Sequence, residues 1–319
     1  MLENNAHSIQ ICTISDGRAG NARQAEAMGG ALADDVTAFS LEPRAPWRWT
    51  APRRWPGAER AYGDAFAALL DAPPALAIGC GRQAALATRL LRGRGTKVVQ
   101  ILDPRIDPGH WDFVVVPEHD RLRGPNVITT LGSLHPIDDA WLARARAEFA
   151  AFFELPRPIN VVLLGGRSRH ARFDRMAFEV LASKLEAVLA REGGSVLLTT
   201  SRRTPKELRD VLEHRYDDTP GVVWRSAKDG PNPYPGLLAW ADRIVCSPDS
   251  VNMITEACAT RVPVFVFDPG RVRGRPRAFV DALLGSGRIR AMDARLDGFD
   301  VEPLRETARV ASILRERLG

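Results

Sequence analysis

The chain has 319 residues, of which 45% are hydrophobic and 26% charged, and its formal net charge is +5. This length suffices for two domains with separate cores, and this composition excludes a disordered or low-complexity chain. No apolar run approaches the ~20 residues of a membrane span. We expect no signal peptide, because the first apolar run begins only at Ile9.

Arginine carries nearly all of the positive charge, and the arginines are scattered along the chain. We find no basic patch interleaved with aromatic residues, so nucleic acid is not an expected partner. The four cysteines, Cys12, Cys80, Cys246 and Cys258, form no CxxC pair and have no histidine at ligand spacing. They are typical of buried thiols in a reducing compartment, and no metal site is expected.

The first half alternates short apolar runs with helical patterns, which predicts parallel strands joined by helices. Strands are expected at 8–14, 36–41, 76–78, 98–102, 113–116 and 127–130. Helices are expected at 22–32, 58–70, from Gln83 to about Leu91, and 140–153. This half therefore predicts a Rossmann-like domain.

A glycine-containing loop, Asp16-Gly17-Arg18-Ala19-Gly20-Asn21, follows the first strand. Its two glycines allow the backbone to approach a ligand or a neighbouring segment closely. An ordinary tight turn between strand and helix explains the local sequence equally well. Its place at the opening of the first strand–helix unit favours a ligand-binding loop.

Polar residues also follow two later strands, at Asp103 and at Glu118-His119-Asp120. His119 is a candidate for acid–base chemistry or phosphate contact, with a surface histidine as the alternative. His135 precedes Pro136 and favours the surface interpretation. Between the second strand and the next helix, the segment 43–56 interleaves arginine with three tryptophans. Aromatic packing under a loop is one interpretation of it. Contact with a membrane interface, or covering an acceptor, is the other.

The pattern restarts after the Leu155-Pro156-Arg157-Pro158 linker, which we take as the domain boundary. Strands are expected at 159–164, 195–200, 222–224, 243–246 and 262–267, and helices at 174–190, 237–241, 250–260 and 302–318. We therefore expect domains at 1–154 and 155–301, followed by a C-terminal helix at 302–319 that packs back across the cleft between them.

The second half has its own polar loops at strand ends. Gly165, Gly166 and Arg167 open a cation-rich loop suited to a diphosphate, and Ser201 and Arg202 follow the next strand. For Arg169 and Arg172 in the first of these loops, a solvated position is equally consistent.

The stretch 232–269 is the most informative. Ser247, Asp249 and Ser250 stand where a strand ends and a helix begins, so they are typical helix caps beside an anion-attracting helix terminus. Glu256 lies about two turns into that helix, among small residues. A buried carboxylate is costly without partners, and a ribose diol would provide them. An ordinary capped strand–helix–strand unit is the plain alternative.

The whole chain resembles the mitochondrial fission ("elongated mitochondria") family of plants and its bacterial relatives, and the stretch 232–269 resembles the nucleotide-sugar donor site of GT-B glycosyltransferases. The resemblance rests on 15–21, 164–166, 200–205, Asn232-Pro233-Tyr234, and 239–263. It implies an α/β fold with two Rossmann-like domains facing a cleft. It also implies that the C-terminal domain binds a nucleotide sugar and that the loop after the first strand meets the acceptor.

On this resemblance, Asp16 is the expected base and His119 the second catalytic candidate. The expected donor-binding residues are Gly165, Gly166, Arg167, Ser201, Arg202, Ser247, Asp249, Ser250 and Glu256. The expected acceptor-side residues are Gly17, Arg18, Gly20, Asn21 and Gln24. No cofactor is expected, because the nucleotide sugar is a substrate, and GT-B chemistry usually proceeds without metal.

The expected function is therefore metal-independent glycosyl transfer from a nucleotide-diphosphate sugar in the bacterial cytoplasm. The acceptor is unidentified, either a saccharide or a lipid-linked group at the inner face of the membrane. A nucleotide-sugar 2-epimerase is the close alternative, with Asp103, Glu118 and Asp120 as candidate acids and bases. A non-catalytic scaffold that binds a membrane or a partner is the other. A dehydrogenase is disfavoured, since no GxGxxG opens a helix with an acidic residue after the next strand.

Overall fold

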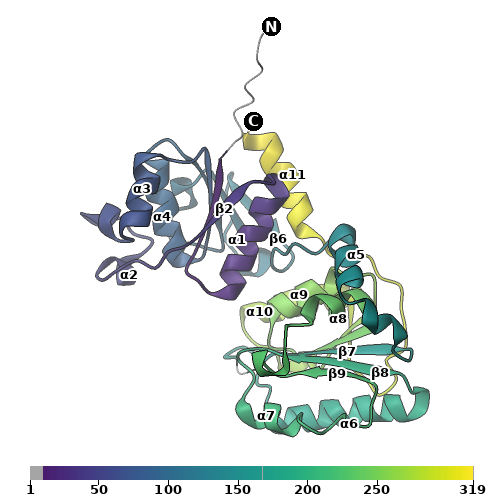
Figure 1. Cartoon of the computed structure of the whole chain (residues 1–319). Helices are drawn as coiled ribbons and strands as arrows, with labels where there is room; N and C mark the ends of the chain where they lie inside the picture. Colours follow the sequence, from purple (N-terminus) through teal and green to yellow (C-terminus); the bar gives the residue numbers. More distant parts are fainter. Residues whose placement is uncertain (1–9, 167, 319) are drawn as a thin grey trace. The chain divides into compact units, whose positions relative to one another are not determined.

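The computed structural model describes residues 10–166 and 168–318, which form two compact units. Among these residues, the first unit comprises residues 10–136 with 305–318, and the second comprises residues 137–166 and 168–304. Each contains one parallel six-stranded sheet with helices on both faces (Figure 1). This is the doubly wound arrangement of Rossmann-like domains, so the expected α/β class with two such domains is confirmed.

The sheet of the first unit has the order β2-β1-β3-β4-β5-β6. Its strands are β1 (Ile11–Ser15), β2 (Val36–Ser40), β3 (Leu76–Cys80), β4 (Lys97–Ile101), β5 (Phe113–Pro117) and β6 (Val127–Thr130). Its helices are α1 (Ala19–Leu32), α2 (Trp47–Thr50), α3 (Asp64–Asp71), α4 (Arg82–Arg92) and α11 (Glu306–Leu318), with 3₁₀ turns η1 (Ala58–Arg60), η2 (Pro108–His110) and η3 (Glu118–Asp120). The central strands are buried on both faces, which is why they are continuous apolar runs.

Two apolar cores cover the faces of this sheet. On one face, Met28 of α1 and Leu314 of α11 pack with Ile78 and Val115 of the sheet. On the other, the core includes side chains of α3, α4 and the 51–61 segment, with Trp111 among them. Helix packing on both faces thus holds the sheet in place. Because the strands are parallel, their carboxyl ends lie along one edge of the sheet.

The sheet of the second unit has the order β12-β11-β10-β7-β8-β9. Its strands are β7 (Ile159–Leu164), β8 (Ser195–Thr200), β9 (Gly221–Trp224), β10 (Arg243–Cys246), β11 (Val264–Val266) and β12 (Ile289–Ala291). Its helices are α5 (Asp139–Glu148), α6 (Arg175–Glu192), α7 (Lys206–Val211), α8 (Tyr234–Trp240), α9 (Val251–Cys258) and α10 (Arg275–Gly285), with 3₁₀ turns η4 (Ala150–Glu154), η5 (Ala227–Asp229) and η6 (Pro269–Arg271).

The compact units divide at other points than the boundaries expected from the sequence. The division after Pro136 precedes the proline-rich linker, because α5 packs against α8 of the second unit. The Arg146 Nε donates to the Ala239 carbonyl at 2.8 Å across that contact. At the other end, α11 joins the first unit, where it packs on α1 and β6 (Figure 1).

Several helix predictions were wrong in extent, and the helix expected at 302–318 begins only at Glu306. The helix expected at 58–70 is a 3₁₀ turn followed by α3, because Gly63 between them has a φ of +79°. The helix expected at 140–153 ends at Glu148 and continues as η4. The short edge strand β12 was not expected, and it pairs in parallel with β11.

Candidate functional site

Each sheet reverses its strand order once. In the first unit the reversal lies between β1 and β3, and in the second it lies between β7 and β10. At such a switch point the connecting helices leave toward opposite faces, and a crevice opens outside the carboxyl ends of the two strands. Doubly wound proteins bind their ligands there, so the loops at these two points are the natural candidates.

At the second switch point, two loops are hydrogen-bonded to each other. The backbone N–H of Gly165, just after β7, donates to the Ser247 Oγ at 2.7 Å. The next N–H, of Gly166, donates to an Asp249 carboxylate oxygen at 2.8 Å. The Ser247 hydroxyl in turn donates to the other oxygen of Asp249 at 2.7 Å. These side chains therefore hold the Gly165-Gly166 turn in place.

Glycine is required at both positions because neighbouring atoms lie too close for a side chain to fit. A Cβ atom at Gly165 would lie 2.2 Å from an Asp249 carboxylate oxygen. A Cβ atom at Gly166 would lie 2.1 Å from the Arg203 carbonyl oxygen, which is backbone and cannot swing away. Residues with a side chain would therefore push apart the loops that follow β8 and β10.

The loop after β8 closes the other side of this turn. The Thr204 hydroxyl contacts the Gly165 carbonyl oxygen and accepts the Ser201 N–H at 2.9 Å. Arg203 donates to Asp249 at 3.0 Å, and that carboxylate is fully buried. Arg202 is exposed beside them. Three strand ends, those of β7, β8 and β10, thus form one polar cluster.

Helix α9 begins directly after this cluster. Ser250 is its N-cap and accepts the Met253 N–H at 3.4 Å. Glu256, further along the helix, is only 2% exposed, and the Tyr234 hydroxyl at the start of α8 donates to its carboxylate. The helix terminus presents N–H groups and partial positive charge, and the buried carboxylate is a hydrogen-bond acceptor.

At the first switch point, Asp16 lies after β1 and is 8% exposed. One of its oxygens accepts the Asn21 side-chain amide at 2.9 Å and the Arg18 N–H at 3.2 Å, and the Arg18 guanidinium lies 3.5 Å from the other. Asn21 also packs on Gly81, after β3, where a Cβ would come within 2.6 Å of its amide nitrogen. The loop is thus fixed to the neighbouring strand end.

Other predicted residues of the first unit lie elsewhere. The Gln24 side chain is buried and binds the Gly20 carbonyl at 3.2 Å and the Leu134 N–H at 3.4 Å, so it ties α1 to the loop after β6. His119 lies in η3 after β5 and is half-buried. Since β3 and β4 separate β1 from β5, about three strand spacings, roughly 14 Å, lie between the two strand ends. Asp16 and His119 therefore belong to separate parts of the sheet edge.

Three residues at the β7–β10 switch point were not predicted as site residues: Tyr234, Arg203 and Thr204. Arg203 stands in a run of two arginines after a strand, and sequence gives no reason to prefer it to Arg202. Thr204 precedes Pro205, a sequence that is typical of an ordinary helix N-cap. The predicted Arg167 lies outside the described residues.

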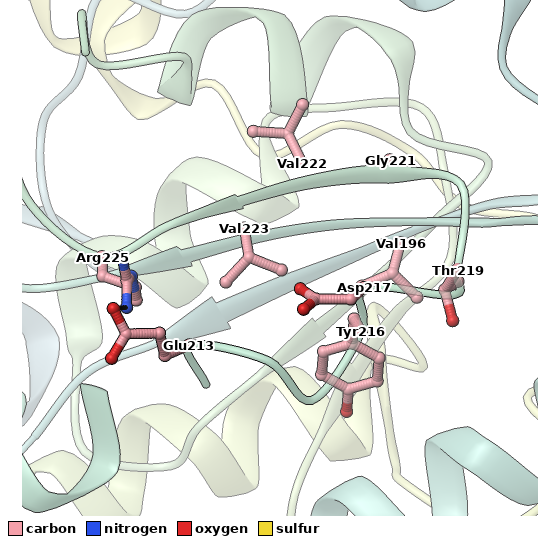
Figure 2. Close-up of a pocket in the computed structure, with 9 residues that line it drawn as sticks. All are labelled: Val196, Glu213, Tyr216, Asp217, Thr219, Gly221, Val222, Val223 and Arg225. Atoms are coloured by element: carbon pink, nitrogen blue, oxygen red, sulfur yellow. Dashed lines mark ion pairs between the residues drawn. The ribbon is translucent and has the colours of Figure 1, made fainter. Parts of the chain in front are cut away.

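A separate pocket of about 270 Å³ lies along the edge strand β9. Figure 2 shows Glu213 and Arg225 at one end, 3.0 Å apart, and Thr219 at the other. None of the predicted site residues lines it.

The cysteines do not contribute a nucleophile at either switch point. Burial raises the pKa of Cys12 and Cys258 to about 12, and it raises the pKa of Cys80 and Cys246 as well. At neutral pH these thiols are therefore protonated and unreactive. Within residues 10–166 and 168–318, no cluster of three metal-binding side chains is present, and no helix has the length and hydropathy of a membrane span.

Comparisons with known proteins agree with this architecture. Residues 19–318 match the model of the family "Mitochondrial fission ELM1". The mitochondrial fission protein ELM1 of Arabidopsis thaliana is 33% identical over 280 residues, which is 77% of this chain. The match spans 64% of the length of the plant protein.

Two solved structures share the fold at low identity. The UDP-GlcNAc 2-epimerase of Methanocaldococcus jannaschii superposes with a TM-score of 0.60 at 13% identity, covering 96% of this chain and 99% of that one. MurG of Acinetobacter baumannii superposes with a TM-score of 0.50 at 12% identity, covering 98% of this chain and 92% of that one. Both are GT-B-type folds, so the structural likeness fixes the architecture.

Proposed function

The chain belongs to the mitochondrial fission ELM1 family, and we propose that it is a glycosyltransferase that binds a nucleotide-diphosphate sugar at the β7–β10 switch point. One observation carries the proposal. The Gly165-Gly166 turn is held by Ser247 and Asp249, directly beside the start of α9 and its buried Glu256. A structural neighbour, a UDP-GlcNAc 2-epimerase by name, acts on a nucleotide sugar and supports this ligand class.

The diphosphate would bind at the start of α9. The N–H groups of its first turn and the helix dipole favour an anion. Exposed Arg202 adds a cation from the neighbouring strand end, while Arg203 offsets the charge of Asp249. Ser247 and Asp249 act by positioning the turn, since their oxygens already accept its N–H groups. These groups would stabilise the negative charge of the leaving nucleotide without a metal.

The ribose would bind Glu256. A carboxylate can accept about four hydrogen bonds, so a ribose diol and the Tyr234 hydroxyl can share it. A ligand without the diol would forgo these hydrogen bonds and should bind more weakly.

Proton abstraction would fall to Asp16. Its carboxylate is buried and held by Asn21 and Arg18, and so it has a fixed orientation. In glycosyl transfer the acceptor hydroxyl loses its proton as it attacks the anomeric carbon, and a carboxylate is a suitable general base for that step.

Thermal melting against UDP-, GDP-, ADP- and CMP-sugars tests the donor site. At a hundredfold excess over its dissociation constant, the correct ligand should stabilise the protein by about 2.7 kcal/mol. Glu256→Gln should abolish the stabilisation, and Glu207→Gln, an exposed glutamate of α7, should retain it. A chain that no nucleotide sugar stabilises would contradict the proposal and favour the non-catalytic scaffold.

A nucleotide-sugar 2-epimerase is the second candidate, favoured by the carboxylates that follow β4 and β5. Asp103 accepts the Arg105 N–H at 2.8 Å, and Glu118 and Asp120 lie in η3. Proton NMR of the stabilising nucleotide sugar separates the two reactions. Epimerisation inverts C2 with or without release of the nucleotide, whereas transfer releases the nucleotide only when an acceptor is added.

A further inference from the structure

The segment 42–60 of the first unit exposes two tryptophans. Trp49 in α2 is 72% exposed and Trp55 is 54% exposed. Such values are unusual for the largest apolar side chain, since tryptophan is highly buried on average in folded proteins. Exposed large apolar side chains that gather on one surface mark a site of interaction.

The exposure does not result from a loose loop. Arg82 donates to the Trp49 and Arg48 carbonyl oxygens at 3.4 Å each, and Arg89 donates to the Pro52 carbonyl at 2.7 Å. Ala51 and Ala58 of the segment are buried in the core of the unit. The backbone is therefore anchored on α4, and Figure 1 shows α2 near α3 and α4.

The chain segments that carry the two exposed rings are held together. Trp47 is half-buried, and its indole N–H donates to the Pro56 carbonyl at 3.3 Å. Trp49 stands two residues after Trp47, and Trp55 directly precedes Pro56, so this hydrogen bond brings their two chain segments together. The protein thus uses one of three tryptophans to fix the segment and presents the other two to solvent.

The same segment is cationic. The segment contains five arginines, all exposed, namely Arg44, Arg48, Arg53, Arg54 and Arg60. They are opposed by two glutamates, and Glu59 is paired with Arg54 at 2.6 Å, so the segment has a net charge of +3. Backbone hydrogen bonding and Arg54 lower the pKa of Glu59, which therefore stays charged at neutral pH.

We propose that residues 42–60 form a docking surface for an anionic lipid bilayer. Tryptophan prefers the headgroup region, where its ring is buried and its N–H stays hydrated, and arginine is attracted to anionic headgroups. A fixed surface with both features suits a flat charged interface, and the protein binds it peripherally. A nucleic acid would also attract the arginines, so the test below includes a competing RNA. The proposal does not depend on the proposed enzymatic function.

Vesicle flotation of the full chain tests it. We compare phosphatidylcholine vesicles with vesicles that contain about 30 mol% phosphatidylglycerol, at near-physiological salt. The chain should float with the anionic vesicles only. Trp49→Ala with Trp55→Ala should lower partitioning about tenfold, since two large apolar side chains are lost from the interface. Arg48→Gln and Arg53→Gln should each lower it about fivefold.

Matched controls come from the second unit. Phe153→Ala removes a ring that is 65% exposed, and Arg144→Gln removes an exposed arginine of α5. Both should bind vesicles like the wild type. All altered side chains are exposed, so melting temperatures should stay close to the wild-type value.

Four outcomes would overturn the proposal. They are failure of the wild type to float, equal binding to neutral vesicles, wild-type binding by the double tryptophan variant, and displacement from vesicles by a short RNA at low concentration. In an anionic vesicle, the tryptophan fluorescence of the wild type should shift to the blue, and the double variant should lose that shift.

Discussion

The Asp249 carboxylate accepts the backbone N–H of Gly166 at 2.8 Å, across 83 positions of the chain. The bond joins the ends of β7 and β10, where the second sheet reverses its strand order. The same carboxylate is fully buried and also accepts hydrogen bonds from Ser247 and Arg203. Asp249 therefore joins the three loops that form the proposed donor site.

Replacing Asp249 by alanine should destabilise the protein strongly. The change removes the acceptor of the buried Gly166 N–H and of the buried Ser247 hydroxyl, at a cost of about 3 kcal/mol or more. Urea unfolding measures it. Asp210→Ala is the matched control, because Asp210 pairs with Lys206 on an exposed face of α7, where about 0–1 kcal/mol is expected. Equal losses of unfolding free energy in the two variants would contradict the positioning role of Asp249.

Gly165→Ala should destabilise the protein and Gly30→Ala should not. At Gly165 the new methyl group meets the Asp249 carboxylate at 2.2 Å, and overpacking of this kind costs about 1–3 kcal/mol. Gly30 is an exposed residue of α1 with no atom within 4 Å of the new methyl group. Its replacement should stabilise the protein by about 0.5–1 kcal/mol. Thermal melting distinguishes the two, and a neutral Gly165→Ala would show that the loops can separate freely.

Stability should fall at acidic pH through Asp229. The Arg225 side chain, by its hydrogen bonds, lowers the pKa of this carboxyl below 3.8, and the Arg225 and Ser226 N–H groups add to the effect. A pKa that is lowered in the folded state contributes stability above the unfolded value, and this contribution is lost as the pH falls through the folded value. The free energy of unfolding should therefore decline below about pH 4.

Asp229→Asn should flatten that decline, as measured by urea unfolding between neutral and acidic pH. The control is the same substitution in an Arg225→Gln background, where the main partner is absent and the slope should change much less. If Asp229→Asn leaves the acid slope unaltered in the wild-type background, the ion pair does not persist in solution.

Asp16→Asn should slow glycosyl transfer strongly while preserving the fold. The amide oxygen can still accept the Arg18 N–H, so the melting temperature should change little. The loss of a general base should lower the rate about 10²–10⁴-fold, measured as acceptor-dependent release of the nucleotide. Asp103→Asn is the control, since Asp103 follows β4 and also accepts a backbone N–H. If Asp103→Asn removes activity instead, the epimerase assignment is favoured.

Strand-end loops were the part of the candidate site that could be predicted. Gly165, Ser201 and Ser247 each follow an apolar run, and in a parallel sheet all such ends meet at one edge. The particular partners could not be predicted. The pairing of Asp249 with Gly166 depends on β10 lying beside β7, and strand order is a property of the whole sheet.

The predicted domain and helix boundaries were wrong where tertiary packing outweighed the local sequence pattern. The proline-rich linker at 155–158 looks like a domain boundary, but α5 before it packs against α8. Likewise, the 58–70 stretch has a helical pattern, and a single glycine at position 63 with positive φ breaks it.

By itself the sequence determined the α/β class, the succession of strands and helices, and the loops that carry polar residues, because these follow from the periodicity of apolar side chains and from turn-forming residues. The tertiary structure alone decided which strand ends are neighbours, that Ser247 and Asp249 hold a turn, that Tyr234 meets Glu256, and that Trp49 and Trp55 face solvent while Trp47 is anchored. Each of these depends on contacts between residues distant in the chain. Such contacts arise from the joint packing of helices on a sheet and leave no local signal in the residues that make them.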